Sequence, residues 1–185
     1  LFKLAKTKSD FVVASIFVNP LQFDDAQDLA NYPRTPDRDI EIAADFGVTH
    51  LWLPKEEEIY PSEVKKLSAG ELGNVYEGAN RPGHFDGVVT VVSRLFELLK
   101  PEAAIFGEKD FQQLTLIRAI AKSVKIIAAP TLREADGLAM SSRNVRLDKE
   151  SRVAASVIYQ GLIAAKASLN VQEARSQMRK VCATQ

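Results

Sequence analysis

The sequence is short of the residues that build disulfide frameworks and metal centres. It has 185 residues but a single cysteine, Cys182, so an internal disulfide is excluded. That cysteine and the two histidines together give too few ligands for a typical zinc site. A protein without disulfides suits a reducing compartment, and we therefore expect a cytoplasmic location.

The chain also lacks an excess of charge of one sign and any long apolar run. Lysine plus arginine and aspartate plus glutamate both number 24, so no overall field draws the protein towards nucleic acid or an anionic membrane. No apolar run approaches the roughly 20 residues of a membrane-spanning helix, and the first residues do not read as a signal peptide. We expect neither nucleic acid nor a membrane as a partner.

Two common nucleotide-binding motifs are missing as well. The sequence contains neither GxxxxGK[ST] nor GxGxxG, so P-loop chemistry and dinucleotide binding have no motif to support them. Any phosphate site must therefore be assembled from a local constellation of other residues.

What the sequence does contain is an alternation of strand and helix patterns typical of an α/β fold. The run FVVASIFV, residues 11–18, predicts a strand buried on both faces. Residues 35–47 predict a helix with Thr35 as its N-cap and Gly47 as its stop. Further strands are expected at 48–54, 103–107 and 124–130, and further helices at 87–99 and 110–123. The order predicts a doubly wound parallel sheet.

The pattern changes after Pro130. Residues 131–144 read as a polar loop, and the chain from Asp148 onward reads as helix, with no further strand pattern. We expect a nucleotide-binding domain over residues 1–130 and a second, incomplete element over residues 131–185.

Polar residues follow several of the predicted strands, where ligands bind in open α/β sheets. The candidates are Asn19 and Gln22 after the first strand, Gly107, Glu108, Lys109 and Asp110 after the third, Met140, Ser141, Ser142 and Arg143 in the last loop, and Arg81 and His84 before a helix. Three of them are cationic and suit phosphate, two are hydroxyl donors, and the Asp110 carboxylate suits Mg²⁺ or a ribose. This combination favours a nucleotide ligand.

The segment around Gly107 is the most informative of these. Glycine permits close approach of the backbone to a ligand, and the helix that follows offers N–H groups to an anion. Asp110 and Gln113 are three residues apart and share a helix face, whereas Gln112 is expected to point elsewhere.

Each candidate also has a purely structural interpretation. Lys109 and Asp110 could form a solvated ion pair at a helix start, and His84 could be a loop histidine that holds a backbone group. Adjacent serines such as Ser141 and Ser142 often cap helices or form turns. The residue pattern alone supports an α/β nucleotide-binding enzyme and nothing narrower.

Longer segments carry a more specific signal. SIFVNPLQF, NYPRT, EGANRPGHFDGV, FGEKDFQQLTLIR and READGLAMSSRN occur in this order between about residue 15 and residue 144. This series strongly resembles the pantothenate synthetase family. The resemblance implies a Rossmann-like domain of the nucleotidyltransferase superfamily, a small C-terminal domain and a homodimer. It also implies that pantoate and Mg·ATP form pantoyl adenylate, which β-alanine then converts to pantothenate and AMP.

The resemblance assigns roles residue by residue. Lys109 and Arg143 would be catalytic, and Gln22 would contact pantoate and β-alanine, with Gln113 on pantoate. The ATP-binding set implied is Gly107, Glu108, Lys109, Asp110, Leu132, Met140, Ser141, Ser142 and Arg143, with Asp110 on the ribose or Mg²⁺ side. Asn19, Arg81 and His84 would be further pocket residues.

One part of the family pattern is absent. The family has a glycine-rich HxGH-type segment ahead of residue 15, and these 185 residues contain none. We expect that residues before Leu1 are missing from this sequence, and that pieces are missing between Pro61 and Glu77 and near 120–126. The alternatives are another adenylyltransferase of the same superfamily, which transfers AMP to a phosphate acceptor, and a non-catalytic nucleotide-binding homologue.

Overall fold

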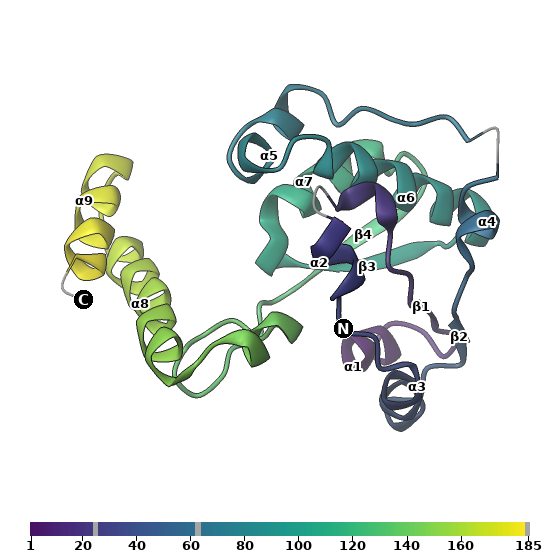
Figure 1. Cartoon of the computed structure of the whole chain (residues 1–185), viewed down its shortest axis with the longest axis horizontal. Coiled ribbons are helices and arrows are strands. Elements are labelled where there is room, and N and C mark those ends of the chain that lie inside the picture. Colours follow the sequence, from purple (N-terminus) through teal and green to yellow (C-terminus); the bar gives the residue numbers. More distant parts are fainter. Residues whose placement is uncertain (24–25, 62–63, 184–185) are drawn as a thin grey trace. The chain divides into compact units, whose positions relative to one another are not determined.

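The chain divides into two compact units, Leu1–Pro130 and Thr131–Gln185. The computed structural model describes residues 1–23, 26–61 and 64–183. The α-helices are α1 Phe2–Lys6, α2 Ala26–Ala30, α3 Pro36–Asp45, α4 Glu56–Ile59, α5 Glu77–Asn80, α6 His84–Leu99, α7 Phe111–Ile120, α8 Lys149–Lys166 and α9 Val171–Cys182 (Figure 1). The 3₁₀ helices are η1 Pro20–Gln22, η2 Glu71–Asn74, η3 Glu108–Asp110 and η4 Ser142–Arg146. Within the described ranges no helix is long and apolar enough to cross a membrane.

The strands of the first unit form two parallel pairs. Strand β1 (Val13–Ser15) pairs with β2 (His50–Trp52), and β3 (Ala103–Gly107) pairs with β4 (Lys125–Ala129). Each pair is connected through a helix, α3 in the first case and α7 in the second, as parallel strands require. The prediction of a mixed α/β fold with parallel strands is confirmed.

The prediction that the first strand is buried on both faces is wrong. Only Val13–Ser15 is extended in a ladder, the Val13 residue is 38% exposed, and Phe11 is 63% exposed. The reason is topological, because within the described residues β1 has β2 as its one strand neighbour. Beside one strand instead of two, its side chains have fewer cross-strand neighbours on each face than those of a central strand.

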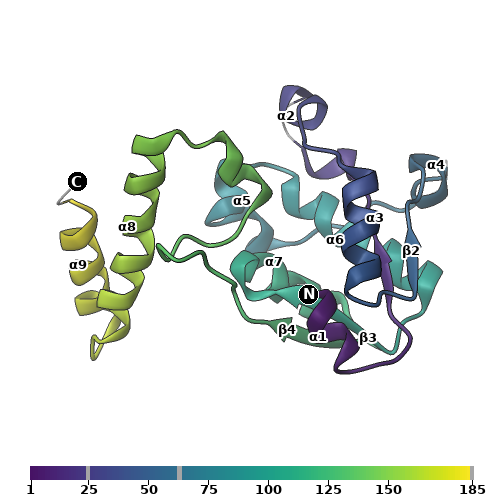
Figure 2. The same ribbon diagram turned by 90° about the horizontal axis from the view of Figure 1, so that it is seen from below.

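The core of this unit is built on α6. Its buried side chains gather with residues of α4 and α7 in one cluster, Ile59, Phe85, Val88, Val89, Val91, Val92, Leu116 and Ile117. Phe96 of α6 meets Phe106 of β3 edge to face, with ring centroids 6.4 Å apart. Figure 2 shows α7 beside the β3–β4 pair. Burial of each such side chain contributes about 1.5–3 kcal/mol, so this cluster fixes the strand ends that carry the polar residues.

A glycine brings α6 against the turn that contains Gln22. A Cβ built on Gly87 would collide with the backbone carbonyl of Leu21, in η1. Any larger residue at this position would therefore push η1 away from the helix.

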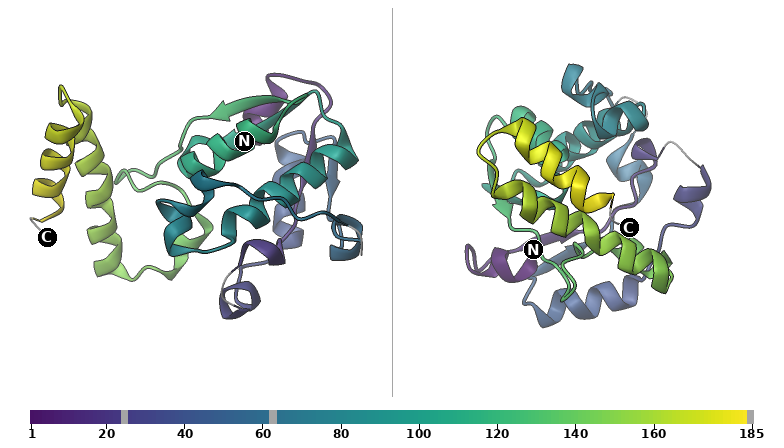
Figure 3. Two further views of the ribbon diagram at one scale, coloured as in Figure 1. Left: turned by 90° about the horizontal axis from the view of Figure 1, so that it is seen from above. Right: turned by 90° about the vertical axis from the view of Figure 1, so that its left-hand side faces the viewer.

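The second unit ends in a pair of packed helices. Helices α8 and α9 lie side by side (Figure 3), and a Cβ on Gly161 would already lie 3.1 Å from the Cγ of Met178. Asp148 caps α8 by accepting a hydrogen bond from the Ser151 N–H at 2.7 Å. The prediction of helix from Asp148 onward is confirmed, with a break between the two helices.

Candidate active site

The first unit contains a cavity at the start of α7. Its volume is about 420 Å³, and its walls come from α5, α6, η3, α7 and the residues beside them. The lining residues are Tyr76, Glu77, Arg81, His84, Phe85, Lys109, Asp110, Phe111, Gln112 and Gln113. Five of these were predicted site residues: Arg81, His84, Lys109, Asp110 and Gln113.

Gln22 is tied to this cavity through its backbone carbonyl. The Nη2 of Arg81 donates to that oxygen at 3.1 Å, and Nδ1 of His84 lies 2.6 Å from it. A carbonyl oxygen only accepts, so Nδ1 of His84 carries the proton. Arg81 Nη1, which only donates, lies 3.4 Å from Nε2 of His84, so this second ring nitrogen is the acceptor. His84 thus helps to order the turn that contains Gln22, as its structural interpretation predicted.

Asn19 connects Gln22 to a residue that the sequence did not single out. The side chain of Asn19, in a residue only 2% exposed, donates to the Gly87 carbonyl and to Oε1 of Gln22, both at 3.1 Å. Its Oδ1 accepts from the Leu21 N–H at 3.2 Å and from the Tyr60 hydroxyl at 2.7 Å. No sequence pattern links Tyr60 to Asn19, because 41 residues separate them.

Tyr60 is held in its neutral form. Burial raises the pKa of Tyr60 well above its ordinary value, the nearby Glu56 carboxylate raises it further, and the hydrogen bond with Asn19 acts the other way. The hydroxyl is therefore a hydrogen-bond donor throughout the physiological pH range.

The charged residues after β3 face solvent at the cavity. Lys109 Nζ lies 3.3 Å from Asp110 Oδ1, and the two side chains are 41% and 60% exposed. A pair this exposed contributes little to stability, so both charges are available to a ligand. Glu108 is also exposed, and a Cβ on Gly107 would meet nothing within 4 Å, so the space beside this glycine is open.

The expectation that Gln112 points elsewhere is wrong. Its Nε2 donates to the carbonyls of Leu72 and Val75 at 2.7 and 2.8 Å, and its Oε1 accepts from the Glu77 N–H at 3.2 Å. The bonds hold the segment that contains Tyr76, whose φ of 51° is rare for a residue with a side chain. Gln112 therefore shapes a wall of the cavity, from contacts 35 to 40 residues away that helix periodicity could not reveal.

The carboxylates at the cavity are few. No group of three or more His, Cys, Asp or Glu residues that could hold a metal ion occurs within the described part of the chain. Asp110 and Glu77 line the same cavity. Mg²⁺ is often bound by one or two carboxylates together with substrate phosphates and water, so this donor set fits Mg²⁺ only with a phosphate ligand.

The remaining predicted residues lie in the second unit. Leu132 and Met140 are 66% and 54% exposed. Ser141 caps η4, because its Oγ accepts from the Arg143 N–H at 3.2 Å, and Ser142 and Arg143 begin that helix. The cap that the structural interpretation predicted is therefore present at Ser141.

An ion-pair network orders the loop that holds these residues. Arg152 of α8 contacts the carboxylates of Glu134 and Asp136, both at 2.9 Å, and Asn144 donates to Glu134 at 3.1 Å. The hydrogen bonds from Arg152 and then Asn144 lower the pKa of Glu134 below its ordinary value. The pKa of Asp136 is lowered first by the Leu138 N–H. Arg152 thus ties Glu134 and Asp136 to α8, and Asn144 ties the other end of the loop to Glu134.

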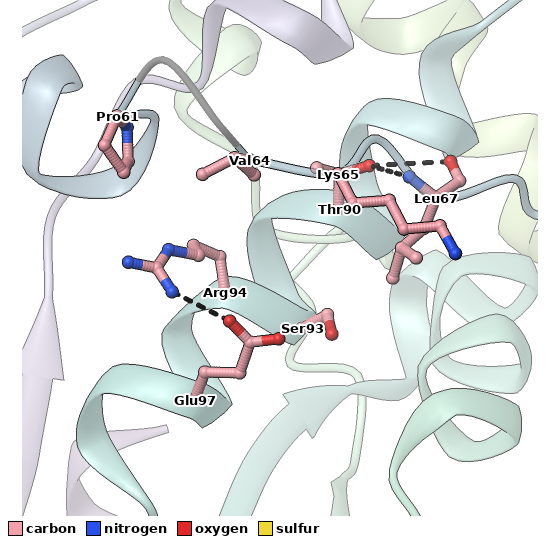
Figure 4. Close-up of a pocket in the computed structure, with 8 residues that line it drawn as sticks. All are labelled: Pro61, Val64, Lys65, Leu67, Thr90, Ser93, Arg94 and Glu97. Carbon is pink, nitrogen blue, oxygen red and sulfur yellow. Dashed lines mark hydrogen bonds and ion pairs between the residues drawn. The ribbon is translucent and has the colours of Figure 1, made fainter.

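A second cavity, of about 360 Å³, contains none of the predicted residues. It is lined by Pro61, Val64, Lys65, Leu67, Thr90, Ser93, Arg94 and Glu97 (Figure 4). Two of its charged residues, Arg94 and Glu97, pair with each other at 2.8 Å, and Thr90 accepts from the Leu67 N–H at 2.9 Å. The first cavity is therefore the candidate active site.

Comparison with known proteins gives one consistent result. The family model described as pantoate-beta-alanine ligase matches residues 1–185. The pantothenate synthetase of Aquifex aeolicus is 47% identical over 178 residues, which are 94% of this chain and 63% of that protein. That of Acidothermus cellulolyticus is 50% identical over 172 residues, 90% of this chain and 57% of that protein. This chain thus spans about 60% of the length of these relatives.

Solved structures agree with the sequence comparison. The pantothenate synthetase of Thermus thermophilus matches with a TM-score of 0.92 and 42% identity, over 100% of this chain and 70% of that one. A pantoate-beta-alanine ligase from Francisella tularensis, complexed with Beta-gamma ATP and Beta-alanine, matches with a TM-score of 0.83 and 38% identity. That match covers 98% of this chain and 71% of the Francisella chain.

Proposed function

This chain belongs to the pantoate-beta-alanine ligase family, and we propose that the protein joins pantoate to β-alanine with ATP. The observation that carries the proposal is the cavity at the start of α7, where Lys109 and Arg81 meet the amide of Gln113 beside the tethered Gln22. Cationic groups suit phosphates and amides suit a small hydroxy acid, so one cavity offers the chemistry of both substrates. The Francisella relative, complexed with Beta-gamma ATP and Beta-alanine, supports ATP and β-alanine as ligands.

The reaction has two steps. A carboxylate oxygen of pantoate attacks the α-phosphorus of ATP, and the bond to the bridging oxygen breaks to release pyrophosphate. The amine of β-alanine then attacks the acyl carbon of pantoyl adenylate, loses a proton, and expels AMP. Both steps depend on position and charge stabilisation, which a preformed cavity supplies without a covalent nucleophile on the protein.

We assign the residues as follows. Lys109 and Arg143 stabilise phosphate charge, and Gln113 and Gln22 hold pantoate, with Gln22 also next to β-alanine. The ATP site would comprise Gly107, Glu108, Lys109, Asp110, Leu132, Met140, Ser141, Ser142 and Arg143. Asp110 would hold Mg²⁺, which neutralises phosphate charge when bound. Asn19, Arg81 and His84 act through Gln22, as their hydrogen bonds indicate.

The same proposal extends to the fold and its setting. In the Rossmann order 3-2-1-4-5-6, strand pairs 3-2 and 4-5 flank strand 1. The pairs β2–β1 and β3–β4 have the arrangement of these flanking pairs. Residues 1–130 would then be the Rossmann-like ATP and pantoate domain, and 131–185 the signature loop with part of a small C-terminal domain. A homodimer and a cytoplasmic location complete the proposal, on the family resemblance and the lack of disulfides.

A product assay tests the proposal. The full-length protein is incubated with Mg·ATP and pantoate, with and without β-alanine, and pyrophosphate, AMP and pantothenate are measured together. We expect pyrophosphate only with pantoate, and AMP and pantothenate only when β-alanine is added. Pyrophosphate with a phosphate ester in place of pantoate would indicate an adenylyltransferase, and ATP binding without pyrophosphate release would indicate a non-catalytic homologue.

A further inference from the structure

The orientation of the Asn19 amide is fixed by the backbone around it. The Leu21 N–H can only donate, so the atom that meets it at 3.2 Å is Oδ1. The Gly87 carbonyl can only accept, so the atom that meets it at 3.1 Å is Nδ2. The reversed amide would place oxygen against oxygen and N–H against N–H. With Asn19 only 2% exposed, water could not relieve that mismatch.

This fixed amide gives its neighbours a fixed polarity. Nδ2 of Asn19 is a donor, so the atom of Gln22 that faces it at 3.1 Å must be Oε1. The Nε2 group of Gln22 is therefore the end that is left for a ligand. On the other side, Oδ1 of Asn19 is an acceptor, so the Tyr60 hydroxyl, 2.7 Å away, must donate. The chain of donors runs in one direction, from Tyr60 through Asn19 to Gln22.

We propose that Tyr60 is a positioning residue for the substrate acid. Its hydroxyl adds a further hydrogen bond to the Asn19 amide that the backbone orients. The bond steadies Asn19, and Asn19 in turn keeps the Gln22 amide with its N–H groups towards the substrate. The inference rests on the proposed function and deepens it. An amide whose N–H groups face the substrate selects an acceptor oxygen. A carboxylate or hydroxyl oxygen of a hydroxy acid satisfies it, whereas an ammonium group in that place does not.

A packing role for Tyr60 makes a different prediction. Its ring lies against the core cluster and meets Phe17 edge to face, with centroids 6.1 Å apart. Tyr60→Phe keeps this ring and removes only the hydroxyl. If packing were its whole role, the variant would bind pantoate as the wild type does. Thr90→Val is the matched control, because Thr90 is also buried and hydrogen-bonded but lines the other cavity.

The experiment measures KM for pantoate, KM for ATP and kcat of the full-length enzyme and its variants. We expect Tyr60→Phe to raise KM for pantoate roughly three- to tenfold, as for one lost hydrogen bond, with KM for ATP within about twofold. Thr90→Val should lower the melting temperature without a selective change in either KM. Unchanged KM for pantoate in Tyr60→Phe, or an equal rise for both substrates, overturns the proposal.

A second variant tests the polarity itself. Asp in place of Asn19 cannot donate to Gln22, so Asn19→Asp should turn the Gln22 amide and present its oxygen to the carboxylate of pantoate. KM for pantoate should then rise more than in Tyr60→Phe, and a wild-type value in a folded variant contradicts the relay. The wild type separates the two proposals: without pantoate-dependent pyrophosphate the proposed function fails, and with it the relay is judged on the variants alone.

Discussion

Gln112 provides the sharpest test of how the cavity wall is held. Replacement by methionine keeps the length of the side chain but removes its bonds to Leu72, Val75 and Glu77. Each such bond contributes about 0.5–1.5 kcal/mol, and these are exposed, so the lower part of that range applies. We expect the free energy of unfolding to fall by about 2 kcal/mol in total. For a chain of this size, the melting temperature should drop by about 4–8 °C.

The assay is thermal unfolding followed by circular dichroism, together with KM values. Because the bonds hold the strained backbone of Tyr76 at the cavity, KM for both ATP and pantoate should also rise in Gln112→Met. Gln113→Met is the neighbouring control, since we assign Gln113 to pantoate alone. A melting temperature within about 1 °C of the wild type in Gln112→Met would refute this reasoning, because three lost bonds must be measurable.

Three further predictions follow from the site and its surroundings. Lys109→Ala should mainly slow pantoate-dependent pyrophosphate release, whereas Gln113→Ala should mainly raise KM for pantoate; equal losses for both substrates in both variants would undo the assignment. Gly87→Ala should destabilise the protein by about 1–3 kcal/mol in a denaturant titration, because its Cβ overpacks against η1; Gly107→Ala, whose Cβ meets nothing within 4 Å and whose φ is −76°, would lack that penalty. The pKa of Glu134 is lowered in the folded state, so its stabilising effect should be full above its ordinary value of 4.5 and should be lost as the pH falls below it. Arg152→Met should flatten this pH dependence, which is checked by measuring the free energy of unfolding at a series of pH values.

Local patterns were sufficient where neighbours along the chain decide the structure. The strand at 103–107 and the helix that contains Val88, Val91 and Val92 are as predicted, because apolar spacing alone determines which face is buried. The burial of the strand predicted at 11–18 was overestimated, because it was inferred from local composition alone. Its composition is that of a central strand, but its burial depends on the elements beside it, and sequence composition does not specify those.

The residues of the candidate site also fall into two groups, those that local sequence predicts and those that depend on long-range contacts. Lys109 and Asp110 could be found because they directly follow a strand, and Gln113 because it is three residues from Asp110 on the next helix. The three line one cavity. Tyr60 and Gln112 could not, because their hydrogen bonds join segments that lie far apart in the sequence. Such contacts depend on the tertiary fold, and no spacing rule for a single helix or strand predicts them.

The central claim is that the pantoate carboxylate is activated by transfer of AMP. The most direct measurement uses pantoate labelled with ¹⁸O in its carboxylate, with Mg·ATP, β-alanine and the full-length enzyme, and mass spectrometry of the products. Attack of a carboxylate oxygen on the α-phosphorus leaves that oxygen on phosphorus when AMP departs. The account predicts one ¹⁸O atom in each AMP formed. Pantothenate formed with unlabelled AMP, or with the label in inorganic phosphate, would contradict it.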